Sequence, residues 1–235
     1  MKRKKLVLFD IDGTLISWVG KHVHGLARFQ HGMKIAWGIE VGNDIEKYNG
    51  VPEWKSSWEV AKQYGVSRSK FEKNFPVYVE AMRAFLDMRG KIAPLYIQIP
   101  DAVNLLVGLH SQAHVHLGVL SANAERTGVW KLEYCNIREF FSFGLWGDRA
   151  ESRVEIAQSV FHKTEEILGL KLLPHDVVVI GDTIHDIRCG KAINAITIAV
   201  ATGPHNAALL NKEHPDLLVD SLMDERVLTL LGLKE

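Results

Sequence analysis

Two acidic side chains, Asp10 and Asp12, stand where a predicted strand ends and could do chemistry together. They follow the unbroken apolar run at 6–9, which is typical of a strand buried on both faces of a parallel sheet. Side chains two residues apart in a strand point to the same side. One such carboxylate can attack phosphorus, while the other gives a proton to the leaving group and later takes one from water. The alternative interpretation is an acidic strand end that caps the turn at Gly13 and Thr14.

A second acidic pair follows another apolar run. Asp182 comes directly after the strand predicted at 177–180 and Gly181, and Asp186 lies four residues further on, one turn away if a helix has begun. A carboxylate at a helix N-terminus is favourable for dipole reasons, but that accounts for one Asp and not for both. A few carboxylate oxygens, with room for water and phosphate, are the ligands that Mg²⁺ prefers. Ligands of open α/β folds sit at the carboxyl ends of the strands, so we expect both acidic pairs at one edge of a sheet.

A third polar group, Ser121 and Asn123, follows the apolar strand predicted at 115–121. A hydroxyl, an amide and the backbone N–H groups that open toward a following helix suit a phosphate. In isolation, these residues are better explained as caps of the next helix. The interpretation as a phosphate site therefore depends on the two acidic pairs.

The elements that position these groups alternate between strand and helix after residue 95. Pro100 and the capping-box pattern at 152–155 mark helix starts. Further strands are predicted at 141–145 and 196–200. Such alternation predicts parallel βαβ units with right-handed crossovers.

Residues 16 to about 94 have a different character. We find no strand there, and the spacing of apolar residues predicts helices at 22–37, 54–64 and 68–88. Four tryptophans lie in this segment and are interpreted as its core rather than as ligand-stacking rings: Trp18, Trp37, Trp54 and Trp58. The first strand precedes this helical segment and its sheet partners follow it, so the α/β core is discontinuous in sequence.

The composition is that of a globular enzyme. The 235 residues are 47% hydrophobic, and 28 Lys and Arg balance 28 Asp and Glu. No net field therefore favours nucleic acid or an anionic membrane as a partner. Two cysteines, Cys135 and Cys189, are too few for a disulfide framework and fit a reducing cytoplasm. The apolar run behind the basic N-terminus is too short for a signal or membrane segment, and the oligomeric state cannot be predicted from the sequence.

The two acidic motifs together resemble the signatures of the haloacid dehalogenase-like hydrolases. The first is an apolar strand followed by Asp-x-Asp-Gly-Thr, and the last is Gly-Asp-x-x-x-Asp at 181–186. The resemblance covers the chain from Leu6 to about Gly203, and the stretch 92–123 resembles the phosphoglycolate phosphatase-like branch. It implies a Rossmann-like parallel α/β core, formed by 1–16 and 93–235, with an inserted α-helical cap domain at 17–92.

The resemblance also implies a role for each motif. Asp10 would be the nucleophile that forms an aspartyl-phosphate, and Asp12 would be the acid and base. Ser121, Asn123 and Thr14 would contribute to the phosphate site. The family also places a basic residue, usually Lys, near a helix start between the second and last motifs. Arg153 stands at that point, with Arg149, Lys131 and Lys163 as rivals. Mg²⁺ would be held by the acidic residues of both motifs, Asp10, Asp12, Asp182 and Asp186.

The insert is expected to choose the substrate. Asn49–Trp54 resembles the cap loop that reaches the active site in this family, which makes Gly50, Glu53 and Trp54 candidate substrate residues. The predicted function is a cytoplasmic Mg²⁺-dependent phosphatase acting on a small phosphorylated metabolite, with no nucleic-acid or membrane partner. A sugar phosphomutase keeps both acids of the first motif and remains an alternative. A non-catalytic phosphate- or partner-binding module on the same fold is the other.

Overall fold

The computed structural model describes residues 3–234 except 21–22, 44–47 and 49. Its centre is a six-stranded parallel sheet in the order β5-β4-β1-β6-β7-β8. The two strands that carry the acidic motifs are neighbours, with Phe9 of β1 opposite Ile180 of β6. The sheet strands are β1 Lys5–Phe9, β4 Val115–Leu120, β5 Phe143–Leu145, β6 Val177–Gly181, β7 Ile196–Val200 and β8 Leu217–Val219.

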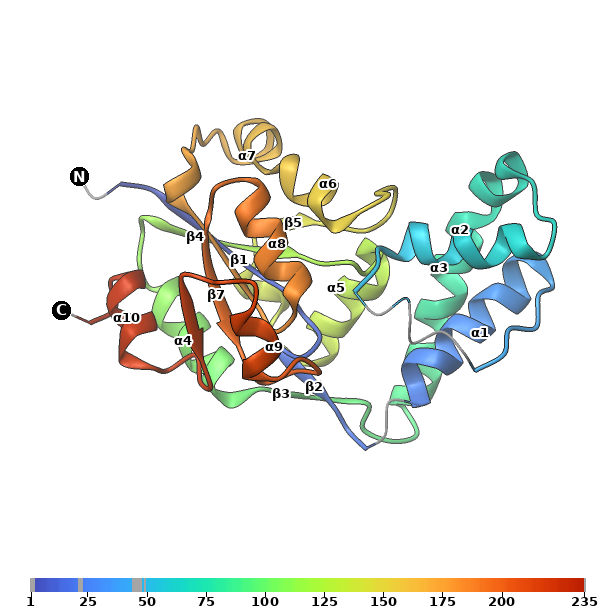
Figure 1. Ribbon diagram of the computed structural model, residues 1–235. Coiled ribbons are helices and arrows are strands. Elements are labelled where there is room, and N and C mark those ends of the chain that lie inside the picture. Colours follow the sequence, from blue (N-terminus) through green and yellow to red (C-terminus); the bar gives the residue numbers. More distant parts are fainter. Residues whose placement is uncertain (1–2, 21–22, 44–47, 49, 235) are drawn as a thin grey trace.

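Helices cover both faces of this sheet (Figure 1). Side chains alternate along β1, so Val7 and Phe9 pack in one apolar cluster while Leu6 and Leu8 pack in the other. The first cluster lies under α4 Pro100–His110, α5 Glu125–Tyr134 and α10 Glu225–Leu231. The second lies under α6 Arg153–Gln158, α7 Val160–Leu168 and α8 Ile184–Ala192. The remaining helices of the described core are α9 Ala207–Asn211 and two 3₁₀ turns at Arg138–Phe140 and Pro174–Asp176. The predicted doubly covered parallel α/β fold is confirmed.

Residues between β1 and β4 form a separate helical group, which lies to the right in Figure 1 and away from both termini. It contains α1 Val23–Trp37, α2 Glu53–Gln63 and α3 Arg68–Gly90. These helices have an apolar core of their own, in which the rings of Trp37 and Phe71 stack at 5.2 Å between centroids. The helices therefore match the spans expected from the apolar spacing, and we refer to this group as the helical insert.

The expectation of a strand-free stretch from 16 to about 94 is wrong at its start. Strand β2 Ile16–Trp18 pairs antiparallel with β3 Tyr96–Gln98, so the two connections to the insert form a two-stranded ribbon. Three residues are too few to show an alternating pattern, and the partner strand is distant in sequence. The ribbon stacks Trp18 on Tyr96 at 4.5 Å between ring centroids.

Two further features differ from the sequence interpretation. The single helix expected after Ser152 is two helices, α6 and α7, that meet at Ser159. Strand β8 at the sheet edge was not predicted, because only three residues of it pair with β7. Among the described residues, no helix has the length and apolar character needed to cross a membrane.

Candidate active site

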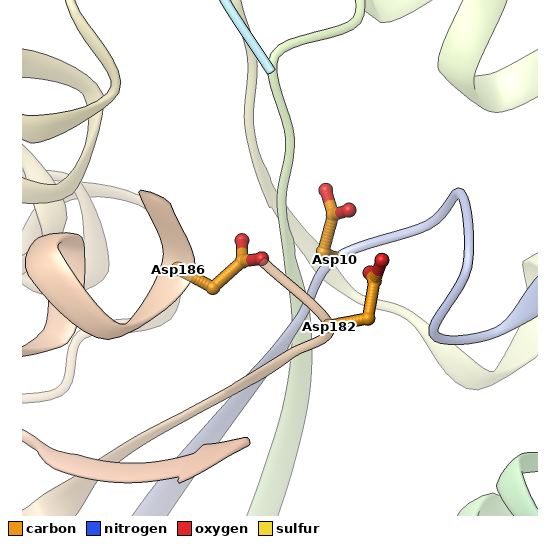
Figure 2. A group of neighbouring side chains, drawn as sticks. All are labelled: Asp10, Asp182 and Asp186. Atoms are coloured by element: carbon orange, nitrogen blue, oxygen red, sulfur yellow. The ribbon is translucent and has the colours of Figure 1, made fainter. Parts of the chain in front are cut away.

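Three carboxylates from the two acidic motifs meet at the carboxyl edge of the sheet. The Asp10 amide still donates to the Ile180 carbonyl at 2.9 Å, which continues the β1–β6 pairing by one residue. Asp182 follows β6, and Asp186 returns from the first turn of α8. Each of the three offers an oxygen, and these oxygens lie within 4.8 Å of one another. Figure 2 shows Asp186 reaching across toward the side chains of Asp10 and Asp182.

Arg153 supplies the positive charge next to this group. Its Nη2 atom lies 3.1 Å from an oxygen of Asp10 and also forms an ion pair with Asp186. The same nitrogen donates to the Leu120 carbonyl at 3.3 Å. Ser152 begins α6 by accepting from the Glu155 amide, which turns Arg153 toward the sheet edge. Arg149 and Lys163, two of its rivals from the sequence, are exposed.

Burial and nearby negative charge oppose the ionisation of Asp10 and Asp182. Burial, with Asp186 and Asp12 nearby, raises the pKa of Asp10 to about 7 despite the opposing charge of Arg153. Burial and the charges of Asp10 and Asp186 raise the pKa of Asp182 well above its usual range. Three carboxylates against one guanidinium leave two uncompensated negative charges when all are ionised. A divalent cation would balance them.

The donor set also fits such an ion. Thr14 donates to one oxygen of Asp182 at 2.8 Å, and the other oxygen of this buried carboxylate, Oδ2, has no partner among the described groups. Asp186 is more fully engaged, since one oxygen pairs with Arg153 and the other accepts from the amide and hydroxyl of Thr183. Oxygen ligands from a few carboxylates, with room for water and phosphate, are the ones that Mg²⁺ prefers. Thr14, predicted at the phosphate site, thus orients Asp182.

Because Gly203 has no side chain, the Asp182 carboxylate can lie directly against its backbone. A Cβ atom at this position would lie 1.7 Å from Asp182 Oδ2, and Thr14 anchors the other oxygen of that carboxylate. We therefore expect Gly203→Ala to displace Asp182 and to lower both turnover and Mg²⁺ affinity by about tenfold or more. Gly42→Ala is the control, since a Cβ atom there meets nothing within 4 Å and its backbone has no positive φ. Titration of activity with Mg²⁺ measures the effect, and native-like metal affinity in Gly203→Ala would contradict the assignment.

Asp12 is not part of the three-carboxylate group, although the sequence predicts that it shares a strand face and a metal with Asp10. Strand β1 ends at Phe9, and the chain turns through Gly13 at φ +89°, so the two-residue strand period no longer holds. Asp12 Oδ2 accepts from Lys131 Nζ at 2.5 Å and from the Asn123 amide at 2.9 Å. Burial opposes ionisation of Asp12, but the Lys131 charge and these two hydrogen bonds outweigh it and lower its pKa.

Ser121 and Asn123 lie at this edge of the sheet as expected, but their side chains are hydrogen-bonded to each other. The Asn123 amide nitrogen also donates to Ser121 Oγ at 2.9 Å, and its amide oxygen accepts from Lys131 at 2.8 Å. Ser121 and Asn123 are both buried. Asn123 therefore holds Lys131 and Asp12 in place.

The loop that opens α2 lies directly on the core. The Glu53 amide donates to the Ala122 carbonyl at 2.8 Å, and the Trp54 amide donates to the Gly147 carbonyl at 3.1 Å. Gly50, at φ +75°, passes so close to His185 that a Cβ atom would lie 2.6 Å from its ring. Asn49, the first residue of the predicted loop, lies outside the described residues.

The two predicted loop residues Glu53 and Trp54 have different surroundings: Glu53 forms an ion pair, and Trp54 packs in the core of the insert. The Glu53 carboxylate is buried and pairs with Arg28 at 3.0 Å and with the Tyr78 hydroxyl at 3.1 Å. The Trp54 ring instead packs edge-on against Phe75 at 4.7 Å between centroids, so the structure does not bring it to the acidic residues. No sequence pattern indicates Arg28, because one arginine in a helix of the insert resembles any surface cation. For Lys131, the sequence indicates only a rival of Arg153.

A family model for haloacid dehalogenase-like hydrolases matches residues 4–194. The chain belongs to this family of hydrolases. The match contains both acidic motifs, Ser121, Asn123 and Arg153, and it spans the helical insert.

Two curated relatives of the haloacid dehalogenase-like family align over nearly the whole chain. The chain is 26% identical to pyrophosphatase PpaX of Oceanobacillus iheyensis, over 97% of each sequence. It is 23% identical to a phosphoglycolate phosphatase of Chromobacterium violaceum, over 95% of this chain and 96% of the relative.

Solved structures of low sequence identity share the fold. CbbY from Rhodobacter sphaeroides, solved with phosphate, superposes with a TM-score of 0.70 at 17% identity, covering 97% of this chain and 99% of that one. A β-phosphoglucomutase from Clostridium difficile superposes with a TM-score of 0.67 at 19% identity, covering 99% and 98%.

Proposed function

We propose that this haloacid dehalogenase-like hydrolase is a Mg²⁺-dependent phosphatase that hydrolyses a small phosphorylated metabolite through an aspartyl-phosphate. The observation that carries the proposal is the contact of Asp10 with Arg153 beside the unpartnered oxygen of Asp182. The buried nucleophile Asp10 thus lies next to the fixed positive charge of Arg153 and next to a carboxylate oxygen that could bind a cation. The helical insert, joined to the core by the β2–β3 ribbon, would act as the cap over this site.

In the proposed reaction, a carboxylate oxygen of Asp10 attacks phosphorus and the bond from phosphorus to the ester oxygen breaks. Asp12 takes up a proton as the phosphate dianion binds, because a nearby negative charge raises its otherwise lowered pKa, and it gives this proton to the leaving oxygen. Asp12 then takes a proton from water, whose oxygen attacks the phosphorus of the aspartyl-phosphate and releases Asp10 and inorganic phosphate. The Arg153 guanidinium would hold phosphate oxygens with its remaining donors.

The ion would be held by Asp10 and Asp182, and Asp186 of α8 would be the third acidic residue of the metal site. When bound, Mg²⁺ supplies charge stabilisation to the transferring phosphoryl group. Thr14 and Thr183 would keep the ligand oxygens in place through the hydrogen bonds described above. The ion also relieves the repulsion among the three acids.

Release of inorganic phosphate tests the function. The native chain is incubated with a panel of small phosphate esters and an aryl phosphate, with Mg²⁺ and with excess chelator. We expect release that depends on Mg²⁺ and disappears in Asp182→Asn. Full activity in chelator, or no release from any ester, would overturn the proposal.

Binding of Mg²⁺ should also raise thermal stability, and more so at alkaline pH. The folded pKa values of Asp10 and Asp182 lie above their unfolded values, so these groups stabilise the metal-free fold most below about pH 4 and lose that contribution as pH rises through about 7. An ion that neutralises them reverses the loss. We expect the Mg²⁺-induced increase in Tm, by differential scanning fluorimetry, to grow from pH 5 to pH 8. An increase that is equal at both pH values, or unaltered in Asp182→Asn, would contradict this expectation.

A sugar phosphomutase is the second candidate, because a β-phosphoglucomutase shares the fold and the first-motif acids suit either reaction. The two differ in the fate of the aspartyl-phosphate, which a mutase passes to a second sugar hydroxyl and a phosphatase passes to water. Incubation with hexose phosphates separates them: an isomeric hexose phosphate without phosphate release supports the mutase.

A further inference from the structure

A second buried polar cluster lies beside Asp12, between the helical insert and the core. Its members come from α1, β3, α5 and the start of α2, which are distant in sequence. Lys131 Nζ holds Asp12 and lies 5.5 Å from the centres of the Trp18 and Tyr96 rings. Arg28 enters from the insert, and its charge acts on both Asp12 and Lys131. Two cations thus lie near Asp12.

This cluster contains donors without acceptors. Tyr96 is 4% exposed and its hydroxyl has no partner among the described residues, and neither does the buried Nε atom of Arg28. A buried donor that lacks an acceptor costs free energy, so such atoms are expected where a ligand completes the bonding. A carboxylate is already accommodated here, since Glu53 lies between Arg28 and the Tyr78 hydroxyl.

We infer that Arg28, Lys131 and Tyr96 bind an anionic group on the leaving-group side of the substrate, either a carboxylate or a second phosphate. This inference rests on the proposed function, in which Asp12 protonates the leaving oxygen. Because Lys131 contacts Asp12 directly, the anionic group lies within a few bonds of that oxygen. Several donors around one anion match a group with two or three acceptor oxygens better than a single hydroxyl.

Matched substrate pairs test this assignment. The carboxylate pair is phosphoglycolate and 2-hydroxyethyl phosphate, which differ only in a carboxylate and a hydroxymethyl group. The phosphate pair is pyrophosphate and an aryl phosphate of similar leaving-group basicity, and the aryl phosphate also reports activity without either anion. We expect the native enzyme to favour the anionic member of at least one pair by about 50-fold or more in kcat/KM, and the pair that shows the preference identifies the anion.

Tyr96→Phe is the sharpest variant, because it keeps the ring against Trp18 and removes a hydroxyl that bonds to none of the described groups. We expect it to reduce the anionic-to-neutral ratio of kcat/KM by about tenfold, the loss typical of a hydrogen bond to a charged group. Arg28→Lys should retain part of the ratio, whereas Arg28→Met combined with Glu53→Gln, which leaves no buried charge unpaired, should abolish it. Exposed Tyr64→Phe is the control for loss of a tyrosine hydroxyl.

The outcomes separate the two proposals. Hydrolysis of the aryl phosphate without preference in either pair, or a ratio unchanged by Tyr96→Phe and by the double variant, overturns the anion site and leaves the phosphatase proposal standing. Absence of phosphate release from every ester overturns the phosphatase proposal and the anion site with it.

Discussion

Asp10→Asn should abolish turnover, with a loss of about 10⁴-fold or more in kcat, because an amide cannot form the aspartyl-phosphate. The fold should survive, since the side chain keeps its shape and the Asp10 backbone amide still pairs with Ile180. Loss of one charge from a buried group with excess negative charge should raise the Tm of the metal-free protein. Phosphate release and calorimetry on the same preparation measure the two effects.

Asp176→Asn is a matched control for that substitution. Asp176 is as buried as Asp10 but lies at the start of β6, where it accepts from the Leu173 amide and pairs with Arg3. The Asp176→Asn substitution should lower the free energy of unfolding. It should leave kcat within about twofold of the native value, because the Asp176–Arg3 ion pair makes no contact with the three-carboxylate group. Near-native turnover in Asp10→Asn would remove the nucleophile from the proposed mechanism.

Arg153→Ala should be the next most damaging change. It removes the one guanidinium that contacts both Asp10 and Asp186, and loss of such a donor lowers turnover by about 10²- to 10³-fold. It also leaves two buried carboxylates without their cation, which should cost about 3 kcal/mol or more of stability. Turnover with saturating Mg²⁺ and the free energy of unfolding check both effects.

Arg153→Lys should recover part of the activity, because an ammonium keeps the charge but lacks the planar fork that spans two acids. Arg149→Ala is the control, since this arginine is exposed four residues away. If Arg153→Ala is silent while Lys131→Met abolishes activity toward every ester, the cation that steadies the phosphoryl group is Lys131. Asp10 would then act without Arg153.

Local patterns in the sequence were sufficient for five of the six sheet strands, β8 being the exception, and for the acidic residues on them. An unbroken apolar run followed by Asp identifies a buried parallel strand and the edge at which it ends, because burial on both faces and the turn after the strand are properties of a few neighbouring residues. The same reasoning located Asp10, Asp182 and Asp186, whereas the family resemblance singled out Arg153 after Ser152 and left Arg149, Lys131 and Lys163 as rivals.

Only the tertiary structure determines which of the remaining polar side chains contact one another. The turn through Gly13 sends Asp12 to Lys131 rather than to the three carboxylates, and no strand or helix period describes such a turn. Arg28, Glu53 and Tyr96 meet next to Asp12 although they lie on three separate elements. Their association depends on how the helical insert docks on the core, which long-range packing determines, whereas local spacing determines the strands and helices themselves.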